Sequence, residues 1–313
     1  MEAEILVSTV FPGQGSQVVG MGKDLSDNFT LAKQIFQEAD DTLGYKLSDL
    51  MFNGPDKDLE DTSCSQPAIM AVSVACWKVL NEAMGDMKLK VQCSAGHSLG
   101  EYTSLVISGV ISYSDGLRLV QERGRLMHDA SVVRPGSMAA VIGLNEQEVE
   151  TVCSQSGAEM ANINSNDQIV ISGDSEYVAE AVQIASDMGA RKVITLPVSG
   201  AFHSSLMEYA SDGLSKILDE IDFNDSEVPI IANSTGLPVK SADEIKEELL
   251  KGLCSCVQWK DSIQYMVNSG VSNFIEFGPS RVLSSLIKRI NKEVRVESIS
   301  SVKTLEQFVD SHS

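Results

Sequence analysis

The stretch Gly-His-Ser-Leu-Gly at residues 96–100 constrains this chain more than any other, because it fits a nucleophile elbow, a sharp turn between a strand and a helix. A β-prone segment, 89–93, precedes it, and a helical pattern of apolar residues covers 98–110. Glycine on each side of Ser98 lets neighbouring backbone come close. A serine hydroxyl is inert at neutral pH unless a base accepts its proton and N–H groups receive the oxyanion. The helix that begins at Ser98 can supply such N–H groups.

Composition disfavours several classes of protein. The chain has 313 residues, of which 43% are hydrophobic, enough for a large core. No run of about eighteen apolar residues could span a membrane, and residues 1–11 lack the features of a signal peptide. The net charge of −20 argues against nucleic-acid binding, which needs a basic face. Six scattered cysteines predict reduced thiols rather than a metal site, and therefore a cytoplasmic protein.

Two patterns of predicted elements divide the chain. Over 1–131 and again over 200–313, strands and helices follow one another as in a parallel α/β domain. Residues 132–199 follow the order β-α-β-β-α-β, which is typical of a ferredoxin-like domain. We therefore expect a small ferredoxin-like domain inserted into a large α/β-hydrolase-like domain with a parallel sheet. The cleft between them is the natural place for a ligand.

His203 is the candidate base for Ser98. It lies in 199–204, where the small domain returns to the large one, and it is one of four histidines. His97 adjoins the serine, and since adjacent side chains diverge, it is poorly aimed at the hydroxyl. The other two histidines fall at the end of a helix and in the tail. A histidine that packs between two domains without a catalytic role is the alternative interpretation.

Two further positions carry polar groups that could face the serine. Arg123 lies on the helical pattern 114–130, where a guanidinium could bind a substrate carboxylate through two hydrogen bonds. The alternative is a surface ion pair of little energetic worth. Gln14 lies in a Gly-rich turn that lacks the spacing of dinucleotide and phosphate loops. We expect this turn to bring a backbone N–H beside Ser98, to form an oxyanion hole with the N–H of Leu99.

Taken together, the motifs resemble those of the malonyl-CoA:acyl-carrier-protein transacylases, in family order and over nearly the whole chain. The matching segments are FPGQGSQ at 11–17, GHSLGEY at 96–102, QERG at 121–124, AFHS at 201–204, QW at 258–259 and EFGP at 276–279. The resemblance implies an acyltransferase that moves malonyl from malonyl-CoA to the phosphopantetheine thiol of acyl carrier protein. The reaction would pass through a malonyl-serine intermediate, need no permanently bound cofactor and feed fatty acid synthesis.

The resemblance also implies a role for each site residue. Ser98 would be the nucleophile and His203 its base, and a backbone carbonyl near Gln258 would orient His203. Gln14 and Leu99 would supply the oxyanion N–H groups, and Arg123 would bind the malonyl carboxylate. The other expected substrate contacts are Met127 and Phe202 in the acyl pocket, and Asn162, Asn164 and Gln168 near the cofactor arm.

Three alternatives to this function stay open: an acyltransferase of a polyketide pathway, a serine hydrolase or thioesterase with the same elbow, and a non-catalytic carrier-binding homologue. A hydrolase of the α/β type would place its histidine near the end of the chain, whereas His203 lies in the middle. Because an acidic carrier protein would meet an acidic chain, we expect docking at two local basic patches, 191–192 and 288–292. We expect a monomer.

Overall fold

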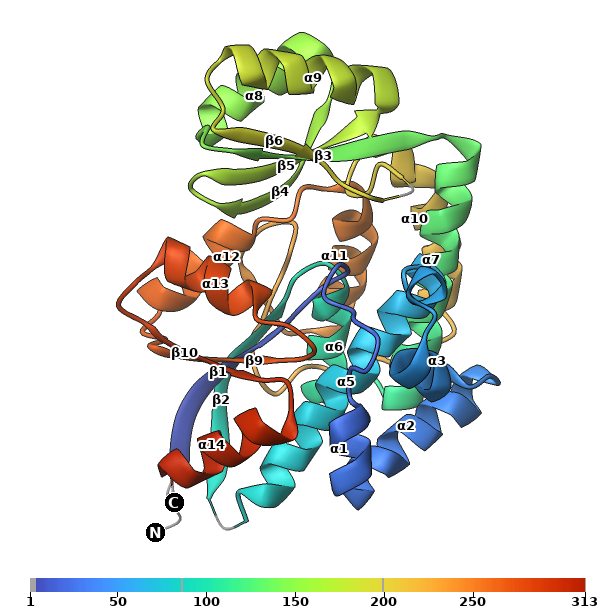
Figure 1. Cartoon of the computed structure of the whole chain (residues 1–313), viewed down its shortest axis with the longest axis vertical. Coiled ribbons are helices and arrows are strands. Elements are labelled where there is room, and N and C mark those ends of the chain that lie inside the picture. The colour runs from blue at the N-terminus through green and yellow to red at the C-terminus, as the bar shows by residue number, and fades with distance from the viewer. Residues whose placement is uncertain (1–3, 86, 199, 313) are drawn as a thin grey trace.

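A six-stranded sheet forms the centre of the larger part of the computed structural model, which describes residues 4–85, 87–198 and 200–312 (Figure 1). The strands lie in the order β10-β9-β1-β2-β7-β8, and neighbours are parallel except β7 and β8. Their bounds are β1 (Glu4–Phe11), β2 (Lys88–Gly96), β7 (Ile230–Ile231), β8 (Pro238–Val239), β9 (Asn273–Phe277) and β10 (Arg295–Ile299). The predicted parallel sheet is confirmed, with one antiparallel strand at its edge.

Helices pack on both faces of this sheet, since successive side chains of a strand point to opposite faces. Val7 and Phe11 of β1 belong to the largest hydrophobic core, whereas Val10 packs with the two helices α12 and α13. The helices around the sheet are α1 (Lys23–Asn28), α2 (Thr30–Leu43), α3 (Leu47–Asn53), α4 (Asp56–Leu59), α5 (Thr62–Ala83), α6 (Leu99–Ile107), α7 (Tyr113–Val133), α10 (Glu208–Leu218), α11 (Ala242–Cys254), α12 (Trp259–Asn268), α13 (Val282–Ile290) and α14 (Val302–His312).

Helix α5 is the core helix of the large part, because it is apolar on nearly every side and packs against α2, α6 and α7. It begins where the side chain of Asp61 accepts a hydrogen bond from the N–H of Ser63 at 2.9 Å. Among the described residues, no helix combines the length and the apolar character that crossing a membrane requires.

A second sheet of four antiparallel strands lies above the first (Figure 1), in the order β4-β5-β3-β6. Its elements are β3 (Gly136–Ile142), α8 (Glu146–Ser156), β4 (Glu159–Ser165), β5 (Gln168–Asp174), α9 (Ser175–Asp187) and β6 (Lys192–Thr195). The predicted ferredoxin-like order is confirmed, and α8 begins at Asn145 with a capping box.

The small sheet has two different faces. Ala139, Val141 and Ile171 pack in a core with α8 and α9, whereas Met138 and Val170 belong to the core of the large part. Strand β6 ends at Thr195, two residues before Pro197, which has no N–H to continue the ladder. The division of the chain at 131/132 and 199/200 stays a prediction, and Ser199 lies outside the described residues.

Candidate active site

Ser98 lies at the turn between β2 and α6 in a backbone conformation that L-residues rarely adopt, with φ 51° and ψ −104°. The two glycines of the elbow explain how the turn closes. A Cβ at Gly96 would stand 1.8 Å from the backbone of Gly100, and one at Gly100 would stand 1.9 Å from the carbonyl oxygen of Phe11. The expected elbow is therefore present, and it is packed too closely for any side chain at either glycine.

The hydroxyl of Ser98 contacts the imidazole of His203. Ser98 Oγ lies 2.8 Å from His203 Nε2, and His203 Nδ1 lies 2.9 Å from the carbonyl oxygen of Gly252. Because a carbonyl can only accept, Nδ1 carries the ring proton and Nε2 is free to accept the proton of Ser98. Burial and then the positive charge of Arg123 lower the pKa of His203 to about 3, so the ring is neutral at pH 7.

The expectation that a carbonyl near Gln258 orients His203 is wrong. The carbonyl of Gln258 accepts from the N–H and the hydroxyl of Ser262, at the start of α12. Gly252 lies near the end of α11, where the last carbonyl oxygens accept no hydrogen bond from an N–H of the same helix. One of these carbonyls is therefore available to the imidazole.

Arg123 is a buried cation whose side chain is 3% exposed. Its guanidinium donates to Gln66 Oε1 at 2.8 Å and to Ser98 Oγ at 3.0 Å, and it lies over the ring of Tyr102. Its Nε has no hydrogen-bond partner, and none of the described carboxylates forms an ion pair with it. A buried guanidinium without a directly bonded carboxylate is costly, so this site favours an anion.

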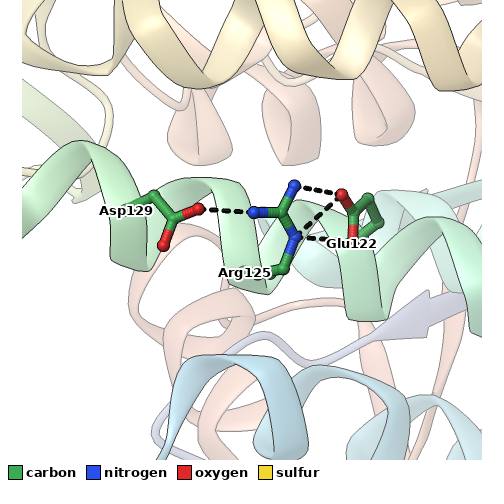
Figure 2. Close-up of polar contacts among 3 residues, drawn as sticks. All are labelled: Glu122, Arg125 and Asp129. Carbon is green, nitrogen blue, oxygen red and sulfur yellow. Dashed lines mark hydrogen bonds and ion pairs between the residues drawn. The ribbon is translucent and has the colours of Figure 1, made fainter.

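Arg125 shows the opposite arrangement on the same helix. Figure 2 shows its guanidinium between the carboxylates of Glu122 and Asp129, one on each side along α7. The Arg125 side chain is about half exposed, at 51%. The surface ion pair that was the alternative for Arg123 is therefore found two residues away, and Arg123 itself points inward.

A cavity of about 420 Å³ opens beside Ser98. Eight of the eleven predicted site residues line it: Ser98, His203, Gln14, Met127, Phe202, Asn162, Asn164 and Gln168. The other three do not line the cavity. Arg123 donates to Ser98 Oγ, Leu99 follows Ser98 in the chain, and Gln258 lies at the start of α12. In the part of the chain that the structure describes, no group of three or more histidine, cysteine or acidic side chains could hold a metal ion.

His97 does not contact the Ser98 hydroxyl, as expected. Its Nε2 lies 2.8 Å from Asn164 Oδ1 on β4, and its ring lies beside that of Trp259. Burial lowers the pKa of His97, so it is neutral and links the elbow to the small sheet. Asn164 therefore lines the cavity while it holds His97, and its contact with substrate stays a prediction.

Two residues that the sequence analysis did not identify support the reacting groups. Asn233, 3% exposed, accepts the N–H of Ser98 and donates to the carbonyl of Gly96, each at 2.8 Å. Gln66, at the start of α5, accepts from Arg123. Because the N–H of Ser98 is already bound, the oxyanion N–H groups must come from elsewhere. Leu99, in the first turn of α6, and the turn of Gln14 fit this role, which stays a prediction.

The profile of the acyl transferase domain matches residues 9–308. A malonyl CoA-acyl carrier protein transacylase of Bacillus subtilis is 39% identical over 305 residues, which are 96% of this chain and 95% of that protein. This chain belongs to the acyl transferase family. Another malonyl CoA-acyl carrier protein transacylase, from Staphylococcus aureus, is 37% identical over 302 residues, which are 95% of this chain and 96% of that protein.

Solved structures agree with this acyl transferase in fold. An acyl-carrier-protein S-malonyltransferase from Bartonella henselae superposes with a TM-score of 0.93 at 38% identity, over 98% of this chain and 99% of that one. A malonyl-transacylase in complex with a type II polyketide acyl carrier protein also has a TM-score of 0.93, at 36% identity, over 98% of this chain and 100% of that one. The chain is an acyltransferase of mixed α/β fold.

The low pKa of His203 predicts how Ser98 reacts in acid. With a pKa of about 3, His203 stays neutral when the pH falls from about 7.5 to about 5, so a fluorophosphonate should label Ser98 at a nearly constant rate. A histidine with the ordinary pKa of about 6.5 would lose about thirtyfold at pH 5. Labelling followed by intact mass, with Ser98→Ala as the blank, measures this. A midpoint near pH 6.5 would contradict the burial argument.

Proposed function

We propose that this acyltransferase moves a malonyl group from malonyl-CoA to the phosphopantetheine thiol of an acyl carrier protein, in fatty acid synthesis. The observation that carries the proposal is Arg123, a buried cation without a carboxylate partner that donates to the nucleophile Ser98. A malonyl group brings a carboxylate that would pair with this cation, and an acetyl group brings none. The names of the similar proteins from Bacillus subtilis and Staphylococcus aureus support the same substrate.

The first half-reaction forms an ester on Ser98. His203 Nε2 takes the proton of the hydroxyl while Ser98 Oγ attacks the thioester carbonyl. The N–H groups of Leu99 and Gln14 stabilise the oxyanion of the tetrahedral intermediate. The bond from carbon to sulfur then breaks, and the proton held by His203 leaves with the sulfur of CoA. In the second half-reaction the phosphopantetheine thiol attacks the malonyl-serine ester and the same steps run in reverse.

Arg123 couples substrate binding to the strength of the base. Its positive charge is the second cause, after burial, of the low pKa of His203. A malonyl carboxylate beside Arg123 would offset that charge and so raise the pKa of His203 when substrate is bound. The base would thus become stronger only when an acyl group with a carboxylate occupies the cavity.

We place the docking of the carrier protein at the basic end of α13. Arg289 donates to Gln168 Oε1 at 2.8 Å, and Gln168 lines the cavity, so this arginine lies close to its mouth. In the other expected patch, Arg191 pairs with Asp167 at 3.1 Å, and its charge is partly offset. The similar malonyl-transacylase whose structure contains an acyl carrier protein supports a carrier protein as the partner.

Monomeric state and cytoplasmic location belong to the same proposal. One chain supplies Ser98, His203 and Arg123, so a single copy holds the reacting groups together. All six cysteines are free, as expected in a reducing compartment. A polyketide pathway is the second candidate, because the carrier protein in one similar structure serves such a pathway.

Substitution of Arg123 tests the proposed substrate. In intact-mass measurements after brief mixing with malonyl-CoA, the wild type should gain about 86 Da on Ser98, and Arg123→Ala should form this adduct roughly thirtyfold more slowly. The cause is the loss of a buried pair of charges worth on the order of 2–5 kcal/mol. Arg125→Ala, on the exposed face of α7, is the matched control and should react like the wild type. Equal rates with acetyl-CoA and malonyl-CoA in the wild type would contradict the proposal.

Charge reversal at the end of α13 and in the loop that follows it tests the docking surface. Arg289→Glu combined with Lys292→Glu should raise the KM for carrier protein several-fold, because an acidic partner loses its attraction, while acylation by malonyl-CoA stays unchanged. The control is Lys33→Glu. Lys33 is an exposed lysine on α2, outside this patch, and its substitution reverses one charge instead of two. An unchanged KM for the double variant would rule out this surface.

A further inference from the structure

Two buried glutamates lie behind the active site, and the mechanism above uses neither. Glu101 on α6 is 4% exposed and Glu248 on α11 is 6% exposed. Glu101 Oε1 accepts the N–H of Asn233 at 3.0 Å, and Glu248 Oε1 accepts the N–H of Ser234 at 2.7 Å. The other oxygen of Glu248 accepts the hydroxyl of Ser234. Carboxyl groups from two helices thus hold two consecutive backbone amides in the segment that follows β7.

This segment fixes the nucleophile. The side chain of Asn233 bridges the elbow, because its Oδ1 accepts from the N–H of Ser98 and its Nδ2 donates to the carbonyl of Gly96. The strained backbone of Ser98 is therefore held from behind by one amide side chain. The backbone N–H of Asn233 donates to Glu101, so a shift of Glu101 would move Asn233 and, through it, Ser98.

The same two carboxyl groups lie against the residue that orients the base. Gly252 follows Glu248 by four residues, so the two share a face of α11. A Cβ at Gly252 would stand 3.4 Å from Glu248 Oε1 and 3.8 Å from Glu101 Oε2. The carbonyl of Gly252 accepts from Nδ1 of His203 at 2.9 Å. The base and the nucleophile are therefore supported by one buried cluster.

We propose that Glu101 and Glu248 are a positioning pair, which fixes Ser98 through Asn233 and His203 through Gly252. Among the described residues no carboxylate bonds to His203 directly, so the pair acts one step removed from the imidazole. The inference rests on the proposed function only in taking Ser98 and His203 as the reacting groups.

The charges around the pair govern how readily it takes up a proton. Burial and then the charge of Glu248 raise the pKa of Glu101 well above its usual range, and burial also raises the pKa of Glu248. Arg123 on α7 opposes the shift at Glu101, Lys251 on α11 opposes it at Glu248, and Tyr102 is the other titratable group beside them.

The test compares three variants by the rate at which a fluorophosphonate labels Ser98, counted per folded molecule. Glu101→Ala removes the acceptor for Asn233 and should slow labelling about tenfold or more, because small displacements of reacting groups cost large factors in rate. Glu101→Gln keeps the shape and an oxygen that can accept from Asn233, and should label within about threefold of the wild type. If Glu101→Ala does not fold, Glu101→Asp, which withdraws the carboxyl group, takes its place.

The matched control is Asp40→Ala. Asp40 on α2 is also buried and also accepts the N–H and the hydroxyl of one serine, Ser48, but it lies outside the active-site cavity. It should lose stability and keep the wild-type labelling rate. With malonyl-CoA, the Glu101→Ala enzyme should show a lower kcat at an unchanged KM. Wild-type labelling by folded Glu101→Ala, or equal slowing of Asp40→Ala, would overturn the proposal.

The pH dependence of unfolding tests the raised pKa of Glu101. A raised pKa in the folded state means that folding binds a proton, so stability falls as the pH rises above the usual carboxyl pKa of about 4.3. The wild type should therefore lose free energy of unfolding relative to Glu101→Gln as the pH rises above about 4.3. A difference that does not change with pH would refute the raised pKa. Because the probe needs no malonyl-CoA, failure of the proposed substrate would be seen separately.

Discussion

The close packing at the elbow is the constraint on which the rest of the site depends. Ser98 can turn from β2 into α6 only because Gly96 and Gly100 leave no side chain between the helix and β1. This turn aims the hydroxyl at His203 and the first turn of α6 at the cavity. The strain at Ser98 is held by Asn233, so the elbow, β7 and the buried glutamates form one support.

A buried positive charge is the basis of the proposed selectivity. Arg123 has no carboxylate partner, lies beside the nucleophile, and keeps His203 weakly basic while the cavity lacks an anion. The exposed Arg125 forms ion pairs with Glu122 and Asp129 on the same helix, so α7 does provide carboxylate partners for an arginine on its surface. In the proposed function, Arg123 instead pairs with the carboxylate of the acyl group.

Local patterns in the sequence predicted the fold class and the main site residues, because an elbow, a capping box and alternating apolar residues are written in consecutive positions. Ser98, His203 and Arg123 stand in such motifs, and they meet as expected. The carbonyl of Gly252, the support from Asn233 and the partner of Arg123 could not be predicted, because they depend on backbone atoms or on contacts between distant segments. The resemblance implied a carbonyl near Gln258, and no side chain marks Gly252 as the residue whose carbonyl contacts His203.

The central claim is that the ester on Ser98 passes to a thiol and not to water. The most direct measurement isolates the malonyl-enzyme, mixes it with carrier protein that bears phosphopantetheine, and follows both masses with time. The account predicts that about 86 Da leaves the enzyme and appears on the carrier protein, much faster than the ester decays in buffer. Loss of the adduct at the same rate with and without carrier protein, with free malonate as the product, would show a hydrolase instead.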